Sequence, residues 1–193
     1  MERATGAPDI HILAFGDSLM AGYGLRSAEG FAPQLEAALR AEGVPATVIN
    51  GGVSGNTAGQ GRARLARVLD GLRRTPDLAI VGLGANDMLR GIPPEQTRAD
   101  LDWILAELGR RGIRSTLAGM LAPPFLGQRY THAFNAIFPD LARQYGSPLY
   151  PFFLAGVAGN AALNLPDRVH PNAKGIARMV RGIVPTVLKA LGR

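Results

Sequence analysis

The feature that most constrains the fold of this chain is a regular alternation of short apolar runs with longer amphipathic stripes. Five apolar runs are predicted to be strands, namely Ile10–Phe15, Thr47–Asn50, Leu78–Leu83, Ser115–Leu121 and Leu149–Phe152. Most of them are almost continuously apolar, which is typical of strands that are covered on both faces. Because strand and helix patterns alternate along the chain, we expect an α/β fold with a parallel sheet between two layers of helices.

The stretches between these runs carry apolar residues at the spacing of one helix face, i, i+3, i+4, i+7. The clearest stripe consists of Leu101, Ile104, Leu105 and Leu108. Similar stripes run over residues 31–39, 65–72, 134–141 and 176–191. The last two contain Pro139 and Pro185. Since proline lacks the N–H of a helical hydrogen bond, we expect these prolines to kink or break their helices.

Length and composition fit one globular domain. The chain has 193 residues, 47% hydrophobic and 19% charged, so we expect a single domain over residues 1–193, with residues 1–8 loosely ordered. The absence of cysteine excludes disulfides and thiolate metal sites. The net charge of +6 comes from scattered residues, which indicates a solvated surface rather than a nucleic-acid site. No apolar stretch reaches the ~18 residues of a membrane span.

Glycines and polar residues gather directly after the predicted strands. The segments are Gly16–Leu19, Gly51–Thr57 and Gly84–Asp87, together with Asp167–Pro171 before the last helical stripe. In a parallel α/β sheet, functional loops follow the carboxyl ends of the strands. We therefore expect these four segments to share one edge of the sheet.

Ser18 and His170 are candidates for nucleophilic catalysis. A serine hydroxyl directly after a buried strand is exposed at the sheet edge, but it needs a base to remove its proton. His170 follows Asp167 by three residues, a spacing that lets the carboxylate hold one ring nitrogen while the other faces the serine. Two structural alternatives stay open: Ser18 as the N-cap of a helix, and Asp167 with His170 as caps of the last helix.

An ester hydrolase also needs donors for the negative oxygen of its tetrahedral intermediate. The Gly55 backbone N–H and the Asn86 side-chain amide are candidates. The glycine loop has two alternatives, a tight turn or a phosphate cradle, although the glycine spacing matches neither G-x-G-x-x-G nor a P-loop. Asn86 has the alternative of holding its own turn.

Taken together, the four segments resemble the SGNH (GDSL) hydrolase family. The blocks are Gly16-Asp17-Ser18-Leu19, Gly55 within Val53–Thr57, Gly84-x-Asn86-Asp87 and Asp167-x-x-His170-Pro171, and they occur in the family's order. The resemblance covers nearly the whole chain and is strongest to the bacterial thioesterase/lysophospholipase and arylesterase branch. One departure is Ala85, where many relatives have a second glycine.

The resemblance implies both a fold and roles for these residues. It implies a three-layer α/β/α flavodoxin-like fold with a central five-stranded parallel sheet. Ser18 would be the nucleophile, His170 the general base and acid, and Asp167 the residue that orients it. The oxyanion hole would consist of the Ser18 N–H, the Gly55 N–H and the Asn86 amide. No metal or organic cofactor is implied, and the partner is a small acyl or aryl ester.

The substrate is predicted from two apolar, proline-containing loops at the same edge. Tentative substrate-binding residues are Met88, Leu121, Pro123 and Phe125, whose apolar side chains suit an acyl chain or an aromatic ester. The alternative is that these side chains only cover the end of the sheet. We therefore expect a serine esterase for short- to medium-chain acyl or aryl esters, with thioesters and lysophospholipids as further substrates.

Other functions and the cellular location stay open. A carbohydrate O-acetyl esterase or an acyltransferase of the same family is the first alternative, and a flavodoxin-like phosphate-binding module or a partner-binding protein without activity is the second. Relatives in this branch are often exported, so the resemblance implies a periplasmic or secreted protein whose signal segment has been removed. If Met1 is the natural start, the protein is expected in the cytoplasm.

Overall fold

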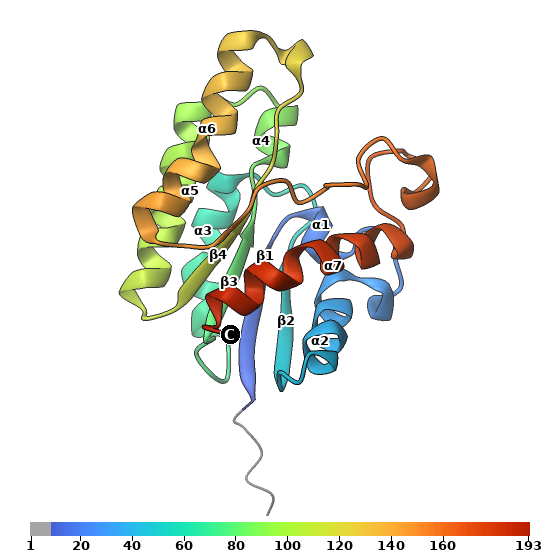
Figure 1. Cartoon of the computed structure of the whole chain (residues 1–193). Coiled ribbons are helices and arrows are strands. Elements are labelled where there is room, and N and C mark those ends of the chain that lie inside the picture. Colours follow the sequence, from blue (N-terminus) through green and yellow to red (C-terminus); the bar gives the residue numbers. More distant parts are fainter. Residues whose placement is uncertain (1–8) are drawn as a thin grey trace, which may run out of the picture.

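A computed structural model describes residues 9–193, whose strands form one five-stranded, all-parallel sheet (Figure 1). The strands are β1 (Ile10–Gly16), β2 (Ala46–Gly52), β3 (Leu78–Gly82), β4 (Arg114–Ala118) and β5 (Leu149–Tyr150). Their order in the sheet is β2-β1-β3-β4-β5, which is the flavodoxin-like doubly wound order. The predicted α/β fold is confirmed. The expectation for residues 1–8 lies outside the described residues.

Within residues 9–193, seven α-helices flank this sheet, and five of them form the two layers. The seven helices are α1 (Ser18–Ala21), α2 (Phe31–Ala41), α3 (Ala58–Asp70), α4 (Ala85–Leu89), α5 (Pro94–Arg110), α6 (Gln128–Tyr145) and α7 (Ala173–Ala190). Helices α2 and α7 pack against each other on one face, and α3, α5 and α6 cover the other (Figure 1). Three short 3₁₀ helices, η1 (Ser27–Glu29), η2 (Pro124–Leu126) and η3 (Ala161–Leu163), lie in the connections.

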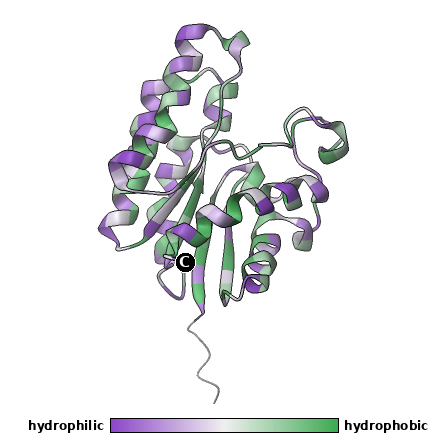
Figure 2. Cartoon of the chain, viewed as in Figure 1, coloured by the Kyte–Doolittle hydropathy of each residue, from purple (hydrophilic) through white to green (hydrophobic). Residues whose placement is uncertain are grey.

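The core lies between the sheet and these two layers. All residues of β3 are buried, and in Figure 2 the central strands and the sheet-facing sides of the helices are hydrophobic. The predicted stripe of α5 is fully buried at Leu101, Ile104, Leu105 and Leu108. Among the described residues, no helix is long and apolar enough to cross a membrane.

Three predicted strands end earlier than expected; for the run at 78–83 the difference is a single residue. The run at 115–121 is a strand only to Ala118, and the run at 149–152 only to Tyr150. Pro151 has no N–H to donate to the ladder, so β5 stops before it. Beyond the strands, the Gly119 N–H donates to the Tyr150 carbonyl and the Gly119 carbonyl accepts from the Phe153 N–H, both at 2.8 Å. Residues 119–121 therefore belong to the loop at the edge of the sheet.

The sequence predicts a kink or a break at Pro139 and Pro185, and the prediction of a break is wrong. Both lie inside continuous helices, α6 and α7. Each proline costs about 3 kcal/mol in a helix interior, whereas burying one large apolar side chain contributes about 1.5–3 kcal/mol. Five residues of α6 and seven of α7 are buried, so packing against the sheet holds both helices together through their prolines.

Replacing Pro139 with alanine should therefore stabilise the protein. Pro139→Ala restores an N–H for the Asn135 carbonyl, and the gain is reduced by the greater freedom of the unfolded chain. We expect the free energy of unfolding to rise by about 1–2 kcal/mol, measured by urea denaturation. Pro33→Ala is the matched control, because Pro33 is also exposed but lies in the first turn of α2, where its N–H would have no helical acceptor. A loss of stability in Pro139→Ala would contradict this account.

Candidate active site

The four polar segments meet at the carboxyl edge of the sheet, as the sequence predicts. The segments after β1, β2 and β3 lie side by side there, and residues 151–172 run outward from β5 and return to α7 (Figure 1). The segment after β1 is positioned by the close packing of β1 against β3 at Gly16. At Gly16 an added Cβ would clash with the Gly82 carbonyl and with Met20, so β1 and β3 come together only because this residue has no side chain.

Ser18 is the first residue of α1 but does not cap it. The cap is Asp17, whose carboxylate accepts a hydrogen bond from the Leu19 N–H at 3.0 Å. The Ser18 hydroxyl is therefore free for another partner, and it lies 3.0 Å from Nε2 of His170, 152 residues away in sequence. The alternative that Ser18 serves as the N-cap of a helix is therefore excluded.

Asp167 holds His170 in a fixed orientation. Its Oδ2 lies 2.6 Å from Nδ1 of His170, and its Oδ1 accepts the backbone N–H groups of Val169 and His170 at 2.9 and 3.0 Å. These bonds, first those from His170, lower the pKa of Asp167 to about 2. Since the ionised carboxylate only accepts, Nδ1 carries the proton and Nε2 is left to accept from Ser18. The alternative as helix caps is excluded, because Asn172 caps α7.

Two backbone N–H groups of the site, those of Ser18 and Gly55, have no hydrogen-bond acceptor within residues 9–193. Gly55 has φ = +81°, a conformation that glycine adopts at little cost, and this places its N–H in the loop after β2. Unpaired N–H groups at an accessible site are the donors that an oxyanion hole needs.

The Asn86 amide provides a third donor. Its Nδ2 donates to the Asn56 carbonyl at 3.0 Å and lies 3.5 Å from Oδ2 of Asp17. The side chain therefore spans two neighbouring loops and does not bond its own backbone. The alternative of an asparagine that only holds its own turn is excluded. Thus the structure brings together Ser18, His170, Asp167, Gly55 and Asn86.

Two buried carboxylates lie behind these groups. Burial raises the pKa of Asp17 from 3.8 to about 6, although the Leu19 N–H acts in the opposite direction. Burial also raises the pKa of Asp87, which accepts from the Ala58 N–H at 2.8 Å and from the Thr97 hydroxyl at 3.1 Å. Asp87 thereby fixes α3 and α5 to α4, the short helix that carries Asn86.

A cavity of about 190 Å³ opens at Ser18 and His170. Its apolar lining consists of Leu19, Ala85, Met88, Leu89, Met120, Leu154 and Val169. Of the predicted substrate-binding residues, Met88 lines this cavity. Leu121, Pro123 and Phe125 are not part of its lining; Leu121 and Phe125 are exposed at 43% and 85%.

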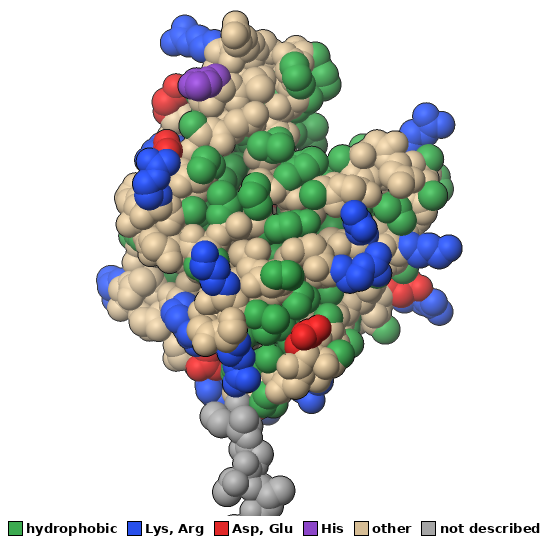
Figure 3. Space-filling model, in the orientation of Figure 1, with side chains coloured by type: hydrophobic (Ala, Val, Ile, Leu, Met, Phe, Trp, Pro, Cys, Tyr) green, Lys and Arg blue, Asp and Glu red, His purple; other side chains and the backbone are tan. Residues whose placement is uncertain are grey.

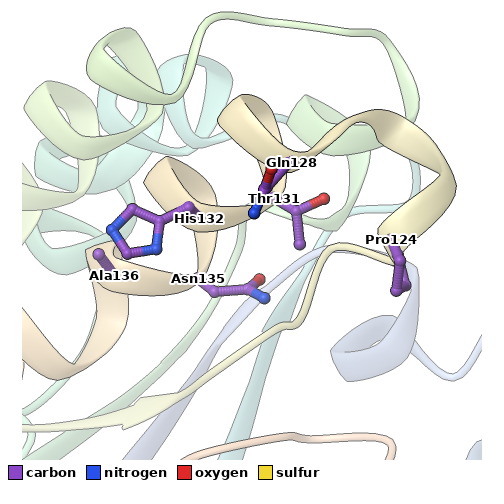
Figure 4. A pocket seen from close by; sticks show the side chains of 6 residues that line it. All are labelled: Pro124, Gln128, Thr131, His132, Asn135 and Ala136. Atoms are coloured by element: carbon purple, nitrogen blue, oxygen red, sulfur yellow. The ribbon is translucent and has the colours of Figure 1, made fainter.

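A larger hollow, of about 540 Å³, lies beside η2 on α6 (Figure 4), and Ser18 is not among its lining residues. Its polar side chains hold the preceding loop: Asn135 accepts from the Ala122 N–H at 2.7 Å, and Thr131 donates to the Pro123 carbonyl at 3.1 Å. His132 lies at its rim and is exposed. Within residues 9–193, no group of three or more His, Asp or Glu is placed to hold a metal ion.

Sequence reasoning missed one side chain that contacts His170 directly. The ring of Tyr23 packs on the imidazole, with ring centroids 4.3 Å apart and planes tilted by 35°. Tyr23 follows α1, five positions after Ser18. Its place between two glycines is typical of a turn, so nothing local indicates that the ring reaches a residue near the other end of the chain.

Fold and site together define an ester hydrolase of the serine type, and comparison with known proteins identifies its family. The model of the GDSL-like lipase/acylhydrolase family matches residues 14–178. The chain belongs to this family and is an SGNH (GDSL) carboxylic ester hydrolase, similar to arylesterases and thioesterases.

Three relatives illustrate the similarity. The SGNH-hydrolase esterase AlinE4 has 48% sequence identity and a TM-score of 0.81, over 96% of this chain and 98% of its own. An arylesterase of Vibrio mimicus is 36% identical over 93% of this chain and 89% of its own. Thioesterase 1/protease 1/lysophospholipase L1 of Escherichia coli is 36% identical over 88% and 78%.

The burial of Asp17 should make stability depend on pH. Its folded pKa of about 6 lies above the ordinary 3.8, so its contribution to stability is fully present below about pH 4 and is lost as the pH rises through about 6. Asp17→Asn lacks this dependence. We expect the free energy of unfolding of the variant, relative to the native chain, to rise by about 2–2.5 kcal/mol from about pH 4 to about pH 7. Urea denaturation at both pH values measures it, with Glu42→Gln, an exposed carboxylate, as baseline. A difference that is the same at both pH values would contradict the prediction.

The position of Asn86 leads to a kinetic prediction. If its amide stabilises the oxyanion, Asn86→Ala should lower kcat by about 10²–10³-fold. KM should change little, because the ground-state carbonyl uses this donor less than the tetrahedral intermediate does. Asn160→Ala is the control, since the Asn160 side chain caps η3. Steady-state kinetics and thermal melting on the same samples decide the question: a large drop in Tm with kcat intact would make Asn86 a structural residue only.

Proposed function

We propose that this ester hydrolase acts on short- to medium-chain acyl or aryl esters through an acyl-enzyme on Ser18. The observation that carries the proposal is the hydrogen-bonded series Asp167–His170–Ser18, with distances of 2.6 and 3.0 Å. A serine hydroxyl so placed can transfer its proton to the imidazole as it attacks.

In the first half of the reaction, His170 Nε2 takes the Ser18 proton while Oγ forms a bond to the ester carbonyl carbon. The carbonyl oxygen becomes negative and accepts hydrogen bonds from Ser18 N–H, Gly55 N–H and Asn86. Asp167, whose pKa of about 2 keeps it ionised, stabilises the imidazolium. When the tetrahedral intermediate collapses, His170 donates its proton to the alcohol, which leaves.

In the second half, water attacks the acyl group on Ser18. His170 Nε2 removes a proton from the water, and the same donors hold the second oxyanion. Collapse breaks the acyl–Oγ bond, the proton returns from His170 to Ser18, and the carboxylic acid is released. The protein groups that act in both halves are the same: Ser18, His170, Asp167 and the three donors.

The lining of the cavity supports apolar acyl or aryl groups. At about 190 Å³ it is smaller than the ~300–1,000 Å³ typical of drug-sized ligands, which favours short and medium chains. The exposed large apolar side chains of residues 9–193 all lie in segments that follow the carboxyl ends of strands: Tyr23, Val53, Leu89, Leu121, Phe125, Leu126 and Val169. On the face seen in Figure 3, apolar side chains gather in the hollow between α6 and residues 151–172.

Thioesters and lysophospholipids are further candidate substrates. The support is the similarity to the relative named thioesterase 1/protease 1/lysophospholipase L1. Leu89 and Val169 line the cavity and are also exposed, so they offer apolar surface to a chain that extends beyond it. The same site attacks a thioester carbonyl in the same way, with a thiol as the leaving group.

A panel of p-nitrophenyl esters of increasing chain length, with an acyl-CoA beside it, tests the substrate class. We expect kcat/KM to peak at short or medium chains, and Ser18→Ala to lower it by several orders of magnitude with every substrate. An organophosphonate should add once to the native chain, on Ser18, as measured by intact mass and peptide mapping. Activity that survives in Ser18→Ala, or labelling at Ser54 instead, would overturn the proposal.

A further inference from the structure

Arg64 of α3 has an environment unlike that of its neighbours on the same helix. Arg62 is paired with Asp100 at 3.1 Å, and Arg67 is exposed. Arg64 is half-buried, has no carboxylate partner within residues 9–193, and lies 4.2 Å from the centre of the Phe15 ring. Burial lowers the pKa of its guanidinium. Placing a cation partly out of water without a counter-charge costs free energy. The hydrogen bonds that the Arg64 guanidinium makes must offset this cost.

The guanidinium donates to two segments that carry candidate oxyanion donors. Its Nη2 donates to the Gly16 carbonyl at 2.9 Å, two residues before Ser18. Its Nε donates to Oδ1 of Asn56 at 2.6 Å, next to Gly55. The Gly16 carbonyl also accepts from the Val53 N–H at 3.0 Å. Arg64 therefore joins the end of β1 to the loop that follows β2.

Through Asn56 this connection reaches the third donor. The carbonyl of Asn56 accepts from the Asn86 amide at 3.0 Å. Hence one planar guanidinium bonds the residue two positions before Ser18 and the residue after Gly55, and through Asn56 it reaches the side chain of Asn86. Ser18, Gly55 and Asn86 carry the three donors of the candidate oxyanion hole.

Two arginines bond the loop after β2: Arg64 through the Asn56 side chain, and Arg90, whose Nη2 donates to the Gly55 carbonyl at 2.7 Å. Val53 and Ser54 are exposed, and Gly55 lacks a side chain that could restrict its backbone. Donors stabilise an oxyanion best when they are already in place before the charge forms. The rigid geometry of a guanidinium, with two N–H groups on two acceptors, fixes relative positions better than an ammonium can.

We propose that Arg64 is a positioning residue that sets the geometry of the oxyanion hole, acting through the Gly16 carbonyl and Asn56. This rests on the acyl-enzyme mechanism proposed above. Arg64 does not touch the substrate; it determines where the three donors stand when the tetrahedral oxygen forms.

The kinetic test compares Arg64→Ala and Arg64→Lys with the control Arg67→Ala. We expect Arg64→Ala to lower kcat by about 10- to 100-fold, since a misplacement of about 1 Å costs a similar factor, while KM changes less than about threefold. Arg64→Lys keeps the charge and one donor and should recover part of kcat, with a Tm close to that of the native chain. Arg67→Ala should keep the native kcat. A kcat unchanged in both Arg64 variants, or a change in KM alone, would overturn the proposal.

A double-mutant comparison separates positioning from general stability. If Arg64 acts through the donors, its replacement should cost less in an Asn86→Ala background than in the native chain, because one donor that it positions is already gone. Equal factors in both backgrounds would show that Arg64 acts elsewhere. Where Arg64→Ala does not fold, Arg64→Lys in the two backgrounds gives the same comparison.

Phosphonate labelling distinguishes this proposal from the mechanism on which it rests. The phosphoryl oxygen of the reagent occupies the place of the oxyanion, so labelling of Ser18 should slow in Arg64→Ala in parallel with kcat. If the native chain is not labelled on Ser18, the acyl-enzyme mechanism fails. If the native chain and Arg64→Ala are labelled equally fast, only the role of Arg64 fails.

Discussion

The hydrogen bond from the Leu19 N–H to the Asp17 carboxylate determines what the first loop can do. Because Asp17 caps α1, the hydroxyl of Ser18 is not needed there and lies 3.0 Å from His170. The capping carboxylate is buried, with 1% of its surface exposed, and its pKa is raised to about 6 by that burial. The site thus depends on a carboxyl group whose ionisation the fold disfavours.

The groups around Asp17 form a layer of polar contacts beneath the site. Asn86 lies between the carboxylate of Asp17 and the carbonyl of Asn56, and Arg64 holds Asn56 from the other side. Asp17, Asn56 and Asn86 lie in the segments that follow β1, β2 and β3. The loops are therefore tied to one another by polar bonds, in addition to the apolar packing that holds their strands in the sheet.

Much of the fold could be predicted from the sequence, because apolar runs and stripes reflect burial directly. The strands near residues 10, 47 and 78 and the stripe of α5 lie where periodicity places them. The order of the strands came from the family resemblance, since alternation alone does not determine it. The break at Pro139 and Pro185 is wrongly predicted because the local propensity of proline does not include the tertiary packing that overcomes it. The strand β5 is shorter than predicted because Pro151 has no N–H to donate.

In the candidate site, the residues of the sequence motifs could be predicted from the sequence. The residues that hold them in position could not. Ser18, His170, Asp167, Gly55 and Asn86 belong to blocks with a recognisable pattern, and the structure brings them together. Tyr23 and Arg64 carry no such pattern. An arginine in an amphipathic helix normally indicates a solvated face, and only the tertiary fold shows that the guanidinium of Arg64 points inward, to acceptors at residues 16 and 56.

The brevity of β5 has a consequence for how molecules of this protein meet one another. A long, flat strand at the border of a sheet offers free backbone groups to a second chain, and short or charged border strands prevent such pairing. Here β5 pairs with β4 over only two residues. The first residues of β4 would therefore be free to pair with a strand of another molecule. That stretch begins with exposed Arg114, whose guanidinium donates to the Ala190 carbonyl at the end of α7, and continues with Ser115, whose hydroxyl is 2.6 Å from that of Ser147. The charge of Arg114, the end of α7 and the segment at Ser147 therefore protect this part of β4 from pairing with another molecule. The carboxyl ends of the strands remain open to the substrate.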